Sequence, residues 1–223
     1  MGSKIMEIKK ETFWQLIEET KNQCGQDMDA SISWIKKELL SMPPEQSLQF
    51  HTIMHGYRDA ADKYGLWTVA TLIKEYGCSD DGFIDFRAWL IAQGKDVYMA
   101  ALENPDSLAK VEKYGDCAFE SLNYVGDEAY HELTGRSAYE DCTPEMEERV
   151  LEEISGEIKY HPLIEYPLQP PDVVTVYPVS LPVYCSVILN LFNIPQHPLF
   201  QQRFFHLEYF TAGAESNGRK RGS

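Results

Sequence analysis

Apolar residues recur every three or four positions between residue 12 and about residue 160, and this spacing constrains the fold more than any other feature. Side chains at that spacing share one face of an α-helix, which can be buried against other helices. Glycine and proline interrupt the pattern repeatedly, and both residues tend to end helices. The sequence therefore predicts a mainly α fold, built as a single multi-helix domain.

The interruptions divide this domain into eight predicted helices. Thr12 and Gln15 have the spacing of a capping box at the start of the first helix, and Asp27 is placed to cap the second. Pro43 ends the second helix, and Gly65 is the predicted end of the third. The predicted helices cover about residues 12–24, 28–42, 44–64, 66–76, 80–93, 95–104, 117–134 and 143–158.

The sequence changes character after His161. Prolines and β-branched residues become frequent, and residues 173–202 contain no Asp, Glu, Lys or Arg. This composition predicts two regions. They are a helical domain at residues 1–160 and a Pro-rich, extended and partly disordered segment at residues 161–223.

The uncharged run at residues 173–194 is long enough to be considered as a membrane span. Pro178 and Pro182 would break a helix inside it, and Asn190 and Asn193 add polar groups that are costly in lipid. We therefore expect this segment to pack on the helical domain or on a partner, and not to cross a membrane.

The net charge of −15 at pH 7 indicates which kinds of macromolecule the protein can bind. An acidic surface repels phosphate backbones, so direct binding of nucleic acid is not expected, whereas a basic protein would be attracted. The predicted last helix carries an acidic face, which is typical of a solvated surface. This face contains Glu145, Glu147, Glu148, Glu152 and Glu153.

The five cysteines are widely spaced, and no two are separated by the two residues of a zinc knuckle or redox turn. This pattern predicts free thiols in a reducing compartment, and hence a cytoplasmic protein. The N-terminus has no apolar run behind its lysines, so we expect no secretory signal.

An acidic pair, Asp80 and Asp81, follows Ser79 at the start of the predicted fifth helix. Hydroxyl and carboxylate groups there accept hydrogen bonds from unpaired backbone N–H groups, so a capping role accounts for the pattern. A second interpretation is that Asp80, Asp81 and Asp85 hold a hard cation such as Mg²⁺. In a third, Asp80 or Asp81 pairs with Arg87 or with an arginine of a partner.

His51, His55 and Asp59 are spaced four residues apart and therefore share one stripe of the predicted third helix. Two histidines at this spacing can bind a transition metal, as in zinc proteases, but the glutamate that serves those enzymes as a base is missing here. The sequence favours a solvated face for these three residues and predicts no metal site.

Most aromatic residues fall at helical spacing, which predicts a role in the core. Trp89 and Tyr98 are the pair that would suit a cleft or an interface, because each joins an apolar ring to a polar group. Together with the acidic group and Arg87 they define a predicted binding cleft, which consists of Asp80, Asp81, Asp85, Arg87, Trp89 and Tyr98. Nucleophile-elbow and phosphate-loop motifs are absent from the sequence, so no cofactor is predicted.

Four stretches carry a resemblance to a known family: "FWQLIEE", "YGLWTVATLI", "GCSDDGFIDFRAWLIAQGKDVYMAALENPDSLA" and "LNYVGDEAYHELTG". In order and spacing the chain resembles, over about residues 8–136, the bacterial family called domain of unknown function 4240. The resemblance implies a small helical, cytoplasmic domain, found alone or attached to other domains. It implies no activity, substrate or catalytic residue.

Two functions from different classes follow. The first is a regulatory, adaptor or immunity-type module without enzymatic activity, whose acidic surface binds a protein, including a basic one such as a nuclease toxin. The second is a metal-dependent hydrolase centred on Asp80, Asp81 and Asp85. The sequence leans towards the first, and it leaves the oligomeric state open.

Overall fold

The structure is a computed structural model that describes residues 9–74 and 77–165, all within one compact unit. These residues form nine α-helices and three 3-10 helices and contain no strand, which confirms the mainly α prediction. The helices are α1 (Lys10–Cys24), α2 (Met28–Leu40), α3 (Pro44–Ala60), α4 (Tyr64–Ile73), α5 (Asp80–Ala92), α6 (Lys95–Glu103), η1 (Pro105–Lys110), η2 (Gly115–Cys117), η3 (Glu120–Asn123), α7 (Val125–Thr134), α8 (Ala138–Asp141) and α9 (Pro144–Ser155).

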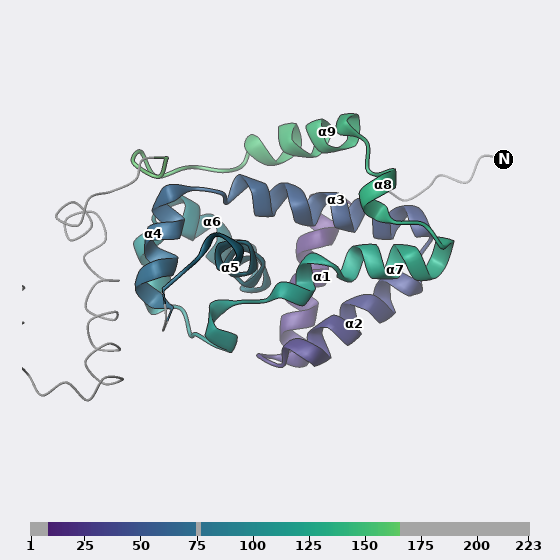
Figure 1. Cartoon of the computed structure of the whole chain (residues 1–223), viewed down its shortest axis with the longest axis horizontal. Coiled ribbons are helices and arrows are strands. Elements are labelled where there is room, and N and C mark those ends of the chain that lie inside the picture. The colour runs from purple at the N-terminus through teal and green to yellow at the C-terminus, as the bar shows by residue number, and fades with distance from the viewer. Residues whose placement is uncertain (1–8, 75–76, 166–223) are drawn as a thin grey trace, which may run out of the picture. The chain divides into compact units, whose positions relative to one another are not determined.

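Helix α5 is the central element of one half of the domain, where α3, α4 and α6 surround it (Figure 1). Its buried face continues a row of aromatic rings that begins at Trp67 of α4. Trp67 stacks on Phe83 with centroids 5.3 Å apart, and Phe86 and Trp89 follow at 6.0 and 5.7 Å. Aromatic pairs of this kind stabilise a fold by about 0.5–1.5 kcal/mol beyond the apolar area that they bury.

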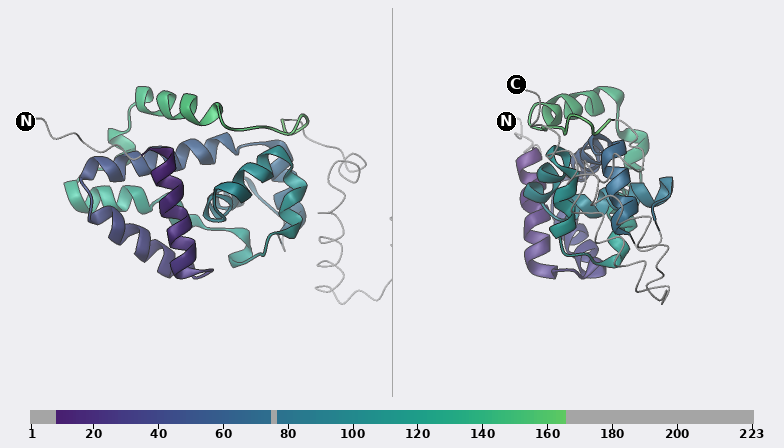
Figure 2. Two further views of the ribbon diagram at one scale, coloured as in Figure 1. Left: turned by 180° about the vertical axis from the view of Figure 1, so that it is seen from behind. Right: turned by 90° about the vertical axis from the view of Figure 1, so that its left-hand side faces the viewer.

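Helix α1 forms the second aromatic centre, where it crosses α3 (Figure 2). The Trp14 ring lies 4.6 Å from Tyr57 and 5.4 Å from Tyr98, and Phe13 packs on Phe50 at 5.2 Å. All five side chains are buried. The core role that helical spacing predicts for the aromatic residues is therefore confirmed for these rings.

Several predicted helix boundaries are confirmed by their caps. Asp27 Oδ1 accepts a hydrogen bond from Ala30 N at 2.9 Å, and Thr143 Oγ1 accepts one from Met146 N at 3.4 Å. Gly135 ends α7 in the left-handed conformation, with φ of 73°. This conformation is open to glycine because it has no Cβ.

Two other predicted boundaries are wrong. Helix α1 begins at Lys10, so Thr12 lies inside its first turn and no capping box forms. Gly65 does not end α3, which stops at Ala60, and it lies instead in the first turn of α4, with its N–H donated to Ile164 O at 2.8 Å. A glycine can lie at either end of a helix. Here the hydrogen bond to Ile164, about 100 residues away, accompanies its place at the start of α4.

The predicted seventh helix is shorter than expected. Gly115, Asp116 and Cys117 have φ of 57°, 53° and 52°, a run of left-handed residues that an α-helix cannot contain. The chain therefore passes through η2 and η3, and α7 starts only at Val125. The short helix α8 was not predicted at all.

Helix α9 lies along α3 (Figure 1). A Cβ placed on Gly56 would approach Val150 Cγ1 to 2.7 Å and Ile154 Cδ1 to 3.0 Å, so the glycine allows the two helices to pack this closely. Ile154 is only 1% exposed. Residues 156–165, called the strap below, follow α9.

The strap binds the ends of three helices. His161 N donates to Leu102 O near the end of α6 at 2.8 Å, and Ile164 O accepts from Gly65 N at the start of α4. Tyr160 Oη donates to Ala60 O, the last residue of α3, at 3.2 Å. These groups have no partner within their own helices, so the strap satisfies backbone atoms that would otherwise need water.

No helix in the described ranges has both the length and the apolar content needed to cross a membrane. The uncharged run at 173–194 and most of the predicted region 161–223 lie outside the described residues, so the two-region division stays a prediction.

Candidate functional site

The start of α5 was the first place predicted for a site. Ser79 is the N-cap residue, and its Oγ accepts a hydrogen bond from Gly82 N at 3.1 Å. Asp80 and Asp81 occupy the first turn of the helix, where both are exposed. A negative charge in a first turn is stabilised by the helix dipole. The serine therefore provides the cap, and the two carboxylates add charge to the same helix end.

Asp85 lies one turn further on and is half-buried. Burial raises the pKa of its carboxyl group, and the nearby charges of Glu120 and Asp81 add to this, while Lys74 opposes it. Within residues 9–74 and 77–165, no group of three or more His, Cys, Asp and Glu side chains lies close enough to hold a metal ion.

Arg87 is buried and does not face the acidic pair. Its Nη1 donates to Arg58 O at 3.1 Å and lies 3.5 Å from Asp62 Oδ2, while its Nε donates to Phe83 O at 3.3 Å. The proposed pairing of Asp80 or Asp81 with Arg87 is therefore not observed. The guanidinium holds α5 against the end of α3 instead.

Trp89 and Tyr98 are both fully buried. Tyr98 Oη donates to Tyr57 O at 2.6 Å, and the Trp89 ring packs on Phe86 and Tyr114. Neither side chain can meet a ligand in an open cleft in this arrangement. The six residues of the predicted cleft thus fall into an exposed helix start, namely Asp80 and Asp81, a half-buried Asp85, and a buried set formed by Arg87, Trp89 and Tyr98.

His51 and His55 correct the prediction of a solvated face. His51 is 3% exposed and His55 is half-buried, and their ring centroids lie only 4.1 Å apart. Burial lowers the pKa of His51 to about 3 and that of His55 to about 4. Asp59, the third residue of the stripe, is exposed and pairs with its neighbour Arg58 at 3.2 Å. The prediction failed because α7 and α8 cover this face of α3.

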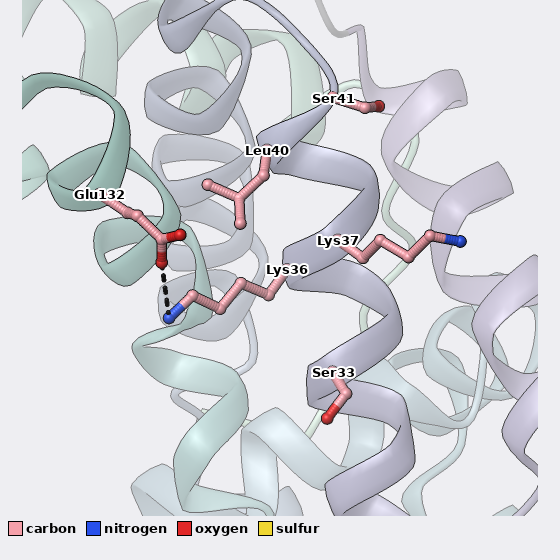
Figure 3. Close-up of a pocket in the computed structure, with 6 residues that line it drawn as sticks. All are labelled: Ser33, Lys36, Lys37, Leu40, Ser41 and Glu132. Carbon is pink, nitrogen blue, oxygen red and sulfur yellow. Dashed lines mark ion pairs between the residues drawn. The ribbon is translucent and has the colours of Figure 1, made fainter.

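An open hollow of about 530 Å³ lies beside α2 and the end of α7 (Figure 3). Lys36 reaches across it to Glu132 at 3.3 Å, whereas the Lys37 side chain points away from that pair (Figure 3). The remaining lining residues are Ser33, Leu40 and Ser41. The positive charge of Lys36 is already paired, so the hollow has no evident ligand chemistry.

A charged cluster that sequence reasoning missed is centred on Glu157 in the strap. Tyr57 Oη donates to its Oε1 at 2.5 Å, and Lys95 Nζ and Lys10 Nζ lie 2.9 and 3.4 Å from its Oε2. The partners come from α1, α3 and α6. The partners of Glu157 are far from it in the sequence, and local sequence patterns do not predict such contacts. The cluster could therefore be found only from the fold.

Unlike Glu157, the glutamates of α9 are exposed and lack ion-pair partners among the described residues. Glu145, Glu147, Glu148, Glu152 and Glu153 are all exposed, and none forms an ion pair with a described residue. Leu151, on the same helix, is 41% exposed. Val150 and Ile154 point the other way, towards Gly56. We call the five glutamates and Leu151 the α9 outer face.

The described residues thus define an all-α domain whose titratable groups serve mainly in caps, internal ion pairs and a charged surface. The chain belongs to the family described as Protein of unknown function (DUF4240), whose model matches residues 8–132. No curated protein and no solved structure gave a significant match. Helices α8 and α9 and the strap follow the matched region.

Proposed function

We propose that this chain acts by binding another protein, as a regulatory, adaptor or immunity-type module, and that the α9 outer face makes the contact. The observation that carries the proposal is that five glutamates of α9 are exposed and form no ion pair with a described residue. Elsewhere acidic residues such as Glu128, Glu132 and Glu157 meet lysines of the same chain.

The chemistry of this face selects a basic partner. Carboxylates spread along one side of a helix attract lysine and arginine and speed their encounter, and the effect weakens as salt screens the charges. Leu151, which is 41% exposed on the same helix, supplies an apolar contact. A basic protein that uses its positive surface to hold nucleic acid, such as a nuclease toxin, would match this charge pattern.

We place this activity in the cytoplasm. Cys24, Cys78, Cys117 and Cys142 are all free thiols in the structure, which supports a reducing environment.

The hydrolase alternative has less support. Asp80 and Asp81 are exposed in the first turn of α5, whereas the third carboxylate, Asp85, is half-buried, and burial raises its pKa. No observation in the described residues favours this alternative over the binding function.

The binding function can be tested with three baits in pull-downs from the source cells. They are the full chain, a variant with the five α9 glutamates changed to glutamine, and a charge-matched control. The control changes exposed acids outside α9 to their amides, at Glu11, Glu19, Asp29, Glu103 and Glu112.

We expect a basic protein to be captured by the full chain and by the control, and to be lost with the α9 variant. Its capture should weaken as salt rises from 50 to 500 mM. Equal capture by all three baits would exclude the α9 outer face, and persistent failure to capture any protein would count against the function itself.

A further inference from the structure

Two imidazole rings lie side by side in the interface between α3, α7 and α8, with their planes tilted by 35°. The His51 and His55 centroids lie 4.1 Å apart, and the Tyr139 ring of α8 meets both edge-on, at 4.5 and 5.3 Å. His55 Nε2 lies 3.3 Å from Asn123 O. Because a carbonyl only accepts hydrogen bonds, this nitrogen carries the proton of the neutral ring.

The interior beside these rings is poorly prepared for charge. His51 Nδ1 is buried without a hydrogen-bond partner among the described residues, and so are both side-chain polar atoms of Asn123. A proton added to His51 would create a donor with nothing to receive it, next to a second imidazole. Burying an unpaired charge is costly unless the surroundings move.

The charged groups that face the pair come from two helices. Arg58, on α3 itself, opposes protonation of both histidines, whereas Asp127 of α7 favours it. Tyr139 of α8 is neutral at these pH values, since burial raises its pKa above the usual one. Asp127 is already engaged: its Oδ1 accepts from Ser137 Oγ at 2.9 Å and from Ala138 N at 2.6 Å.

Two helices, α7 and α8, cover the histidine pair, and α7 is packed against it more tightly than α8. Helix α7 packs so closely that a Cβ on Gly126 would come within 3.0 Å of His51 Cα. Helix α8 has only four residues, and Tyr139, its contact with the rings, is 48% exposed. Helix α8 is therefore the cover that can open.

We propose that His51, His55 and Tyr139 form an acid-sensitive latch, which holds α8 on α3 at neutral pH and releases it as the solution becomes acidic. The same carboxylate links the two states. Asp127 favours protonation of both imidazoles and also accepts hydrogen bonds from Ser137 Oγ and Ala138 N at the start of α8, so an imidazolium that attracts this carboxylate weakens the contact that holds α8.

The direction follows from the histidine pKa values. Above the ordinary pKa of about 6.5 the rings are neutral whether α8 is closed or open, so pH has no effect. Below it the open state binds protons that the closed state refuses, until the closed-state pKa values of about 4 and about 3 are reached. Opening is therefore favoured progressively as the pH falls from about 6.5.

The latch can be tested by amide hydrogen exchange on the full chain at pH 7.5, 6.5 and 5.5, corrected for the intrinsic rate. The amides of Ala138, Asp141 and Cys142 report on α8, and those of Ala88 and Leu90 report on α5. With two histidines of normal pKa in the open state, the opening constant at α8 should rise about 100-fold from pH 7.5 to 5.5. The α8 amides should stay less protected than the α5 amides throughout.

Either of two results would overturn the latch. If α8 and α5 show equal protection at each pH, the histidines are released only when the whole domain unfolds. If α8 protection does not change with pH, the pair controls nothing. A direct NMR titration that places both imidazole pKa values near 6.5 would also overturn the latch, because the closed state would then bind protons as readily as the open state.

Variants separate the latch from other pH effects. His55→Gln should reduce the 100-fold change to about 10-fold, and Tyr139→Ala should leave α8 poorly protected even at pH 7.5. The matched control is His131→Gln, because His131 is an exposed histidine on α7. The control should keep the full 100-fold change, and its loss there would refute the assignment to His51 and His55.

Discussion

At the scale of single residues, the domain depends on polar contacts between segments that are far apart in the chain. Glu157 contacts Tyr57, Lys95 and Lys10, which belong to three different helices. Burial disfavours ionisation of Glu157, but the hydrogen bonds from Tyr57 and Lys95 outweigh it and lower its pKa. The carboxylate is therefore ionised at neutral pH. Tyr57 donates a hydrogen bond to it, and Lys95 and Lys10 form ion pairs with it.

Removing one of these partners should be measurable. Tyr57→Phe deletes the hydroxyl that donates to Glu157, and we expect it to lower the free energy of unfolding by about 1.5–3 kcal/mol, as for a hydrogen bond to a charged group. Tyr160→Phe is the matched control, since its hydroxyl bonds a neutral carbonyl at 3.2 Å and its side chain is 38% exposed. Urea unfolding that shows equal losses for the two variants would contradict the role of Glu157.

Close backbone packing makes a second prediction at this scale. A Cβ on Gly126 would meet His51 Cα at 3.0 Å and His51 N at 3.1 Å, and backbone atoms cannot turn aside as a side chain does. We expect Gly126→Ala to destabilise the domain by about 1–3 kcal/mol in thermal or urea unfolding.

Gly156→Ala is the control for this change. Gly156 has nothing within 4 Å of the added Cβ and a negative φ of −68°. The substitution should be neutral or stabilise by up to about 1 kcal/mol. If Gly126→Ala behaves in the same way, the contact between α3 and α7 is looser than the structure indicates.

At the scale of elements, the helices follow from local sequence wherever a cap or breaker acts alone. Asp27, Thr143 and Gly135 perform the roles predicted for them. Prediction failed where distant contacts decide, as at Gly65, whose N–H bonds the strap, and at the stripe of His51 and His55, which α7 and α8 cover. The same limit applies to the site, because exposure of an acidic helix face can be predicted from periodicity whereas pairing across the fold cannot.

The start of α5 allows capping and charge to be separated by mutation. Ser79→Ala removes the acceptor of the Gly82 amide, and we expect a loss of about 1 kcal/mol at any salt concentration. Asp80→Asn and Asp81→Asn should each cost about 0.3–1 kcal/mol at low ionic strength and almost nothing in 1 M salt. A larger, salt-independent loss for either aspartate would show that its carboxylate has a specific partner.

At the scale of the whole domain, the region matched by the family and the folded unit do not coincide. The match ends at residue 132, yet Ile154, Ile158 and Ile164 are buried in the same core. The strap also satisfies backbone groups of α3, α4 and α6. We infer that α9 and the strap complete the domain in this chain.

Truncation tests this inference. A chain that ends at Gly135 would expose the α3 face at Gly56 and leave Leu102 O, Gly65 N and Ala60 O without their partners. We expect it to lose cooperative urea unfolding, as followed by circular dichroism. An equally steep transition at the same urea concentration as that of the full chain would show that the matched region folds alone.

The strap also has a consequence for the order in which the chain is made. Its residues bind segments that a ribosome produces much earlier, so α3, α4 and α6 emerge before the groups that finish their ends exist. Synthesis of residues 136–165 takes about 2–6 s at ordinary elongation rates. During that interval the α3 face at Gly56 is not yet covered, because Val150 and Ile154, which pack on it, belong to residues 136–165.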